Sequence, residues 1–215
     1  PVVTQTSKLI MQHINACCAV NPVNLMATAL LAAPNQTMDE GELVRTLTFY
    51  TDLIDYHQYS PFITTTRQDA RQQIRHTEEL HLVHRRKHEM GDFIYLDKAH
   101  AVLLTHYRNN ILHLLTMPSL IACCFNNAIS IESATIKRYI KIAYPFLRSE
   151  FFLPWSSADA EKEIDKLLAY LTKTGLITFN EDSNLYSKPG ISTQHHAQLT
   201  TLAQVISPIL RSEEH

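Results

Sequence analysis

The fold is decided by residues 82–96, LVHRRKHEMGDFIYL. Two short runs, 82–87 and 93–96, are separated by residues 88–92, which include a glycine. Short strands with glycine in the turn between them are typical of a β-hairpin. The segment from Thr64 to Leu80 has the pattern of an amphipathic helix. The stretch therefore predicts a helix that leads into a hairpin.

The same plan occurs again near the C-terminal end. Residues 176–179 and 185–187 flank a polar turn, and a further helix follows from His195 to Leu210. The helix before this hairpin is capped by Ser157 and ends at Thr174, with Gly175 as its left-handed C-terminal residue. A helix leading into a two-stranded wing is the plan of winged-helix modules. Each half of the chain is therefore a candidate for one such unit.

Helices are expected over most of the remaining chain, because the 4 glycines are too few for folds with many tight turns. A capping box at Thr37 begins one helix, and Pro118 and Pro145 end or break two others. The predicted helices are 4–20, 24–33, 37–56, 64–80, 98–117, 119–126, 132–152, 157–174 and 195–210. The predicted fold class is mainly α, a multi-helix domain with two small β-hairpins. Its regions are residues 1–128 and 129–215, separate or joined in one compact unit.

Charge and hydropathy argue against nucleic acid as the default partner and against a membrane-spanning helix. The 19 basic and 21 acidic side chains give a net charge of −2 and a pI near 6.7, so no global field attracts nucleic acid. No run reaches the roughly 18 apolar residues of a membrane-spanning helix. The best one, Ile111 to Phe125, is interrupted by His113 and Pro118.

The cysteines and the ends of the sequence indicate where the chain belongs. Cysteines 17–18 and 123–124 are adjacent pairs within helical patterns, which favours buried, reduced thiols in a cytoplasmic protein. The sequence opens at Pro1 without a methionine or a signal peptide, and it stops soon after a helical pattern. We therefore expect a soluble segment cut from a larger protein.

The 12 histidines suggest a metal site, but their spacing does not support one. His106, Asn110 and His113 share one face of the predicted helix 98–117, yet no carboxylate or cysteine completes a ligand set. We expect these histidines at the margin of an apolar stripe and predict no metal and no cofactor. Asn110 falls inside that stripe, so its amide is expected to bond a neighbouring backbone group. The stripe comprises Val102, Leu103, Tyr107, Ile111, Leu114 and Leu115.

One segment is locally basic. It consists of Arg67, Arg71, Arg75, Arg85, Arg86 and Lys87. Such a patch is suited to an acidic protein, anionic lipid headgroups or a nucleic-acid backbone. A solvated helix face is the competing interpretation, because arginines at 67, 71 and 75 would share one side of a helix.

The residues needed for common catalytic sites are missing. Gly-x-Ser-x-Gly and phosphate-binding glycine loops do not occur. His84 and Glu89 are five residues apart, but His84 lies on a predicted strand entering a turn, and we interpret the spacing as chance. The sequence therefore predicts no complete catalytic site in this chain.

Several motifs resemble one enzyme family. They are Asn21-Pro22-Val23-Asn24-Leu25, Gly91-Asp92, Tyr107-Arg108-Asn109-Asn110-Ile111, Pro118-Ser119-Leu120-Ile121-Ala122 and Tyr144-Pro145-Phe146-Leu147. Over nearly its whole length the chain is similar to bacterial membrane-bound glycerol-3-phosphate acyltransferases, in the region C-terminal to the acyltransferase domain. The resemblance implies a parent enzyme that moves a fatty acyl group from acyl-CoA or acyl-carrier protein to the 1-hydroxyl of glycerol 3-phosphate. This is the first step of phospholipid synthesis.

The resemblance also places the chemistry outside this segment. The family's hallmark is His-x4-Asp, whose histidine is a general base, and none of the 12 histidines here has that spacing. No catalytic residue is carried over. The resemblance implies a helical accessory region that docks on the acyltransferase domain at the cytoplasmic face of the bacterial inner membrane, with peripheral lipid contact as a further option.

For docking we select Tyr107, Arg108, Asn109 and Asn110, because the planar guanidinium of Arg108 suits a carboxylate or phosphate. The competing interpretation is that these residues only hold the segment's own core. The alternative function is a tandem winged-helix-like module that binds protein or nucleic acid. The acyl-donor preference, the oligomeric state and any duplication of the two halves do not follow from the sequence.

Overall fold

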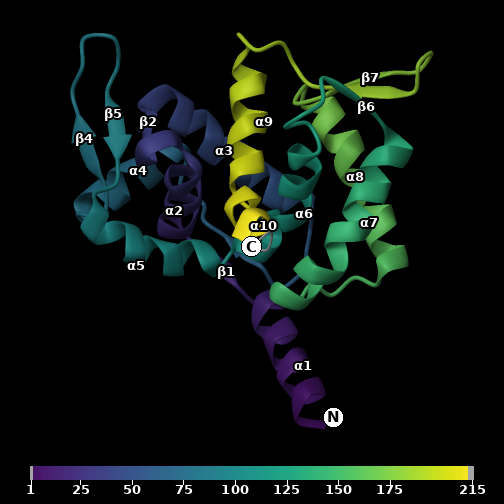
Figure 1. Ribbon diagram of the computed structural model, residues 1–215. Helices are drawn as coiled ribbons and strands as arrows, with labels where there is room; N and C mark the ends of the chain where they lie inside the picture. Colours follow the sequence, from purple (N-terminus) through teal and green to yellow (C-terminus); the bar gives the residue numbers. More distant parts are fainter. Residues whose placement is uncertain (1, 213–215) are drawn as a thin grey trace. The chain divides into compact units, whose positions relative to one another are not determined.

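The computed structural model describes residues 2–212 and is mainly helical with small sheets (Figure 1). The outer ends of the two predicted regions, residue 1 and residues 213–215, lie outside the described residues. The chain forms two compact units, residues 1–114 and 115–215. No helix in the described part is long and apolar enough to cross a bilayer.

The first unit contains a three-stranded antiparallel sheet with helices around it. The sheet has the order β2-β5-β4, and Ile94 in its central strand pairs with Met38 and Arg85. A short parallel pair joins β1 to β3. The elements are α1 (Val2–Ala16), β1 (Ala19–Val20), α2 (Pro22–Ala32), the 3₁₀ turn η1 (Pro34–Gln36), β2 (Thr37–Asp39), α3 (Glu40–Tyr56), β3 (Thr64–Thr65), α4 (Ala70–Glu79), β4 (His84–Arg86), β5 (Phe93–Tyr95) and α5 (Lys98–Asn109).

The second unit has a sheet of the same kind, with the order β6-β8-β7. Tyr186 in its central strand pairs with Ile131 and Phe179. The elements are α6 (Leu112–Cys123), whose first turn belongs to the first unit, β6 (Ser130–Glu132), α7 (Ser133–Glu150), α8 (Ser157–Lys173), β7 (Thr178–Asn180), β8 (Leu185–Ser187), α9 (Gln194–Gln204) and α10 (Ser207–Ser212). Both predicted hairpins are therefore confirmed.

One plan occurs twice in the chain. Each unit runs strand, helix, helix, hairpin after an apolar helix, and each places the last strand between the other two, which is the winged-helix order. The turn after α4 matches the turn after α8. His81 and Gly175 have φ of 56° and 78°. The next residue donates its backbone N–H five residues back in both units, Leu82 to Thr77 and Leu176 to Leu171.

The start of α3 differs from the prediction. Thr37 does not cap this helix; it begins strand β2, and Asp39 is the N-cap, accepting hydrogen bonds from the backbone N–H groups of Gly41 and Glu42. The physical reason is pairing with β5, which is distant in the sequence and engages the backbone of Thr37 to Asp39. A local capping pattern cannot reveal such a partner.

The predicted end of the helix 98–117 is wrong. The helix breaks at Asn110, and α6 then continues through Pro118. The predicted apolar stripe is wrong within α5, where Val102 is 71% exposed and Leu103 44%, whereas Leu104 is fully buried. Ile111, Leu114 and Leu115 are buried as expected. Helix α7 likewise runs through Pro145. The turns that flank Pro118 are buried, and such tertiary packing overrides local preference, whereas Pro145 lies exposed on a half-buried helix.

The two terminal helices also differ from their predicted ranges. Helix α1 ends at Ala16, and its apolar side chains Leu9, Ile10 and Ile14 are more than half exposed. The predicted helix 195–210 is divided into α9 and α10 by a turn at residues 205–206.

Candidate functional site

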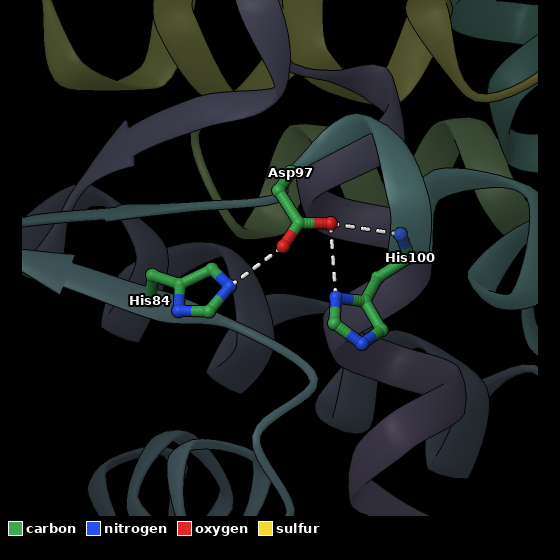
Figure 2. A group of neighbouring side chains, drawn as sticks. All are labelled: His84, Asp97 and His100. Atoms are coloured by element: carbon green, nitrogen blue, oxygen red, sulfur yellow. Dashed lines mark hydrogen bonds and ion pairs between the residues drawn. The ribbon is translucent and has the colours of Figure 1, made fainter.

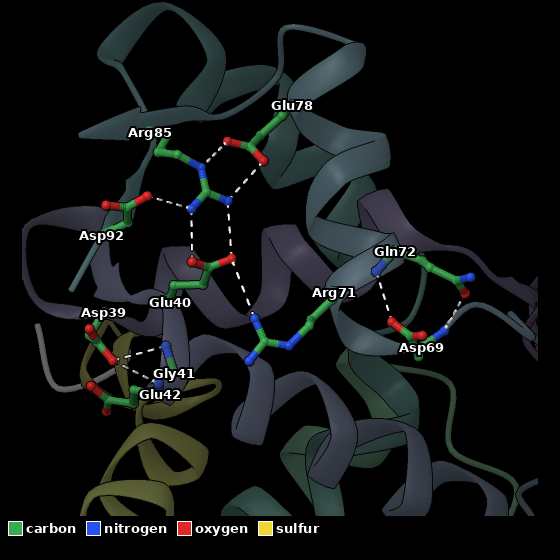
Figure 3. Close-up of polar contacts among 10 residues, drawn as sticks. All are labelled: Asp39, Glu40, Gly41, Glu42, Asp69, Arg71, Gln72, Glu78, Arg85 and Asp92. Atoms are coloured by element: carbon green, nitrogen blue, oxygen red, sulfur yellow. Dashed lines mark hydrogen bonds and ion pairs between the residues drawn. The ribbon is translucent and has the colours of Figure 1, made fainter. Parts of the chain in front are cut away.

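Arg85 lies at the centre of a carboxylate cluster at the base of the first wing (Figure 3). Its Nε and Nη2 donate to Glu78 at 2.8 and 3.1 Å, and Nη1 and Nη2 donate to Glu40 at 2.8 and 3.1 Å. Nη1 also donates to Asp92 at 2.9 Å. These bonds use all five N–H groups of the guanidinium. They tie strand β4 to α3, α4 and the turn before β5.

The cluster sets the ionisation of its members. Hydrogen bonds from Arg85 hold the pKa of Glu40 and of Asp92 below their usual values. The carboxylates, those of Glu78 first and Glu40 next, raise the pKa of Arg85. One cation faces three anions, so the group carries excess negative charge. Arg85 has no N–H left for an added phosphate or carboxylate.

The other predicted basic-patch residues have a different setting. Arg67, Arg71, Arg75, Arg86 and Lys87 are exposed. Arg71 lies 4.0 Å from a Glu40 carboxylate oxygen, and the Arg86 guanidinium lies over the Tyr95 ring at 5.5 Å. Carboxylates therefore enclose the Arg85 guanidinium, whereas the other five cations of the predicted patch are exposed.

A second cluster joins β4 to the start of α5 (Figure 2). Asp97 caps α5, and one of its oxygens accepts from the His100 backbone N–H at 2.8 Å. The same oxygen lies 2.9 Å from His100 Nδ1, and the other lies 2.9 Å from His84 Nε2. The backbone N–H of His100, followed by the bond with His84, lowers the pKa of Asp97 to about 2. The carboxylate is thus ionised at neutral pH.

Sequence reasoning missed this cluster. In the sequence, His84 was paired only with Glu89, at a spacing that we interpreted as chance. The residue that contacts His84 is Asp97, which the antiparallel pairing of β4 with β5 brings close. The only local signal was the spacing of Asp97 and His100, which fits an N-cap and the third residue of a helix. His84 could not be added without the strand register.

The predicted docking residues gather at the C-terminal end of α5. The Tyr107 carbonyl accepts a 2.7 Å hydrogen bond from Asn24, which fixes this helix end to α2. Arg108 is half-buried, and its Nε and Nη2 donate to the Asn109 side-chain oxygen at 3.3 and 3.1 Å. Burial lowers the pKa of Arg108. Asn110 is an exposed C-cap residue, so its expected place inside an apolar stripe is wrong.

The predicted histidine ridge is also divided by the break at Asn110. His106 is exposed on α5, whereas His113 is buried on α6. His113 Nε2 lies 3.0 Å from the Asn15 carbonyl oxygen, and its ring meets Tyr59 edge-on at 4.9 Å. Burial lowers the pKa of His113 to about 4, so the neutral ring donates to Asn15. These two histidines do not form a metal pair.

The second unit has an open hollow of about 680 Å³ lined in part by Cys123 and Cys124. Cys123 Sγ donates to the Ala203 carbonyl, and Cys124 Sγ to that of Leu120. Burial raises the pKa of Cys124 to about 12. A nucleophilic cysteine needs a lowered pKa, so Cys124 is unsuited to act as a thiolate.

Comparison with known sequences decides the family. Residues 1–213 match the family model described as the glycerol-3-phosphate acyltransferase C-terminal region. The chain belongs to this family. A glycerol-3-phosphate acyltransferase of Pseudomonas entomophila is 35% identical over 97% of the chain and 25% of its own length. One from Pseudomonas putida is 36% identical over 94% of the chain and 24% of its length. The chain thus spans about a quarter of these relatives, and the resemblance seen in the sequence is confirmed.

Proposed function

We propose that this C-terminal region supports an acyltransferase domain elsewhere in its parent protein and does not itself catalyse acyl transfer. The parent reaction is transfer of a fatty acyl group from acyl-CoA or acyl-carrier protein to glycerol 3-phosphate. Three facts support the proposal: the family match, the coverage of about a quarter of each relative, and the absence of His-x4-Asp from the sequence.

The docking part of the proposal rests on the surroundings of the Arg108 guanidinium. Within residues 2–212 its hydrogen bonds go to the Asn109 side chain alone, and no carboxylate pairs with it. A half-buried guanidinium has lost part of its hydration, and a neutral amide replaces only some of it. A carboxylate or phosphate on a docked partner would restore the missing interaction through the free N–H groups.

The contacts around Arg108 hold its guanidinium in place for binding an anion on a docked partner. The Asn24 hydrogen bond to the Tyr107 carbonyl holds the end of α5, so the guanidinium starts from a fixed helix end. Asn109 orients its plane through two N–H groups. Preorganisation of this kind reduces the entropy lost on docking.

The test is Arg108→Ala in the full-length enzyme. We expect kcat/KM to fall about 10-fold or more, because a hydrogen bond to a charged group contributes about 1.5–3 kcal/mol. Arg45→Ala is the matched control, since Arg45 is an exposed cation on α3 in the same unit, and it should leave activity unchanged.

The isolated chain separates docking from a purely internal role. There Arg108→Ala should change the free energy of unfolding by less than about 0.5 kcal/mol, because no internal acid is lost. Retained activity in the full-length variant together with lost stability of the isolated chain would contradict the docking proposal.

We also propose that the parent works at the cytoplasmic face of the bacterial inner membrane. The exposed cations Arg67, Arg71, Arg75, Arg86 and Lys87 supply a surface for peripheral contact with anionic lipid. Arg85 is excluded from this surface because its N–H groups are all used. The alternative function is a tandem winged-helix-like module that binds protein or nucleic acid, which the winged-helix order of both units suggests.

A further inference from the structure

Three potential metal ligands meet where the first wing joins α5. They are His84 on β4, Asp97 at the helix cap and His100 in the first turn of α5. Each offers one ligand atom, and these atoms all lie within 4.8 Å of one another. We propose that His84, Asp97 and His100 bind a divalent transition-metal ion, with Zn²⁺ as the best-suited ion.

The donor set supports zinc. Two imidazole nitrogens with one carboxylate oxygen suit Zn²⁺ and neighbouring transition metals, whereas Mg²⁺ and Ca²⁺ require mostly oxygen ligands. Zinc bonds to these donors are about 2.0–2.2 Å long, so neighbouring ligand atoms lie about 3.3 Å apart in a tetrahedral site. Binding would require small side-chain rotations from the 2.9 Å His–Asp contacts and the tautomers in which His84 Nε2 and His100 Nδ1 carry no proton.

The two rings approach the carboxylate from different elements, as Figure 2 shows. His84 Nε2 contacts one oxygen of Asp97, and His100 Nδ1 contacts the other. All three side chains are between 32% and 39% exposed, so an ion and its remaining water ligands have access. The His100 backbone N–H already orients the carboxylate, as outer hydrogen bonds commonly do for metal ligands.

A cap alone would not require this arrangement. The N-cap of α5 needs the Asp97 carboxylate and the His100 backbone N–H, and neither imidazole takes part in it. A bound ion adds a link between β4 and α5, because His84 comes from the strand and His100 from the helix. Its expected effect is to raise the thermal stability of the first unit.

Untagged, metal-stripped chain is the material for the test, with ZnCl₂ added in a calorimetric titration and in thermal unfolding. We expect a single-site isotherm and a higher Tm with zinc, reversed by a chelator. His84→Gln and His100→Gln should each weaken zinc binding about 10-fold or more. Glutamine keeps a polar group near Asp97 and leaves the cap intact. His106→Gln is the control on the same helix, and it should bind zinc like the original chain.

Circular dichroism and Tm without metal establish that each variant folds. Cobalt(II) gives an independent readout, because its visible spectrum reports coordination by imidazole and carboxylate in a tetrahedral site. The proposal is overturned when the original chain fails to bind zinc, or when His84→Gln and His100→Gln bind zinc as well as His106→Gln does.

Discussion

Arg85 and Arg108 differ in what surrounds their guanidinium groups. Arg85 donates to three carboxylates, which come from α3, α4 and the turn before β5, whereas Arg108 is half-buried against a neighbouring amide. In the sequence Arg85 stands in a basic run and Arg108 in an apolar helix. The local pattern therefore suggests that Arg85 is free to bind an anion and that Arg108 is not. The structure shows the reverse, because Glu40, 45 residues away, pairs with Arg85 together with acids from nearby positions.

His113 predicts a pH dependence of stability. Its folded pKa is about 4 against an ordinary 6.5, because burial disfavours the charged ring. The unfolded chain therefore binds a proton more readily, so this contribution is fully present above about pH 6.5 and lost as the pH falls through 4. Between pH 7 and pH 4 the loss from this residue should be about 3 kcal/mol.

The measurement is urea unfolding of the chain and of His113→Gln at both pH values. Glutamine retains an N–H donor for the Asn15 carbonyl but does not titrate. The variant should lose less stability on acidification than the original chain. Equal losses would show that His113 is not the acid-sensitive group.

At the scale of elements, the sequence predicted what depends on local pattern. Both hairpins and most helices follow from turn residues and periodicity, and the structure confirms them. Strands β2 and β6 were missed, because each is three residues long and pairs with a strand far along the chain. The same non-local pairing brings His84 to Asp97, so the candidate metal ligands could not be found from spacing.

The positions of the prolines and of the helix break also could not be interpreted correctly from local sequence. Pro118 and Pro145 lie inside continuous helices, whereas the real break at Asn110 has no proline. Residues 111–122 are buried without interruption, so packing on all sides decides where α6 begins and ends. Local preference is weak beside such burial.

The turn after α8 predicts a cost for Gly175→Ala. Gly175 has φ of 78°, and an added Cβ would lie 3.3 Å from a His195 ring atom. The left-handed backbone and the tight contact should together lower the free energy of unfolding by about 1–2 kcal/mol. Gly190→Ala is the control, because its Cβ would meet Thr193 at an ordinary 3.9 Å. Urea midpoints that fall equally for both variants would contradict this explanation.

At the scale of the whole molecule, a repeated winged-helix plan has to be weighed against the charge it carries. In DNA-binding modules of this kind the second helix of the helical pair enters the major groove. The equivalent helices here are α4 and α8. Helix α4 has two arginines against two glutamates, and α8 has three lysines against four acidic residues. Neither offers the basic excess that phosphate contacts require.

This balance predicts that the chain does not bind duplex DNA tightly. Phosphate neutralisation releases counterions and supplies most non-specific affinity, so a chain of net charge −2 with two balanced helices lacks that driving force. In a mobility-shift assay at about 50 mM salt we expect Kd to be weaker than about 100 µM. A tight complex that dissociates steeply as salt is raised would instead favour the nucleic-acid module. The exposed cations Arg67, Arg75, Arg86 and Lys87 would then be candidates for its contact surface.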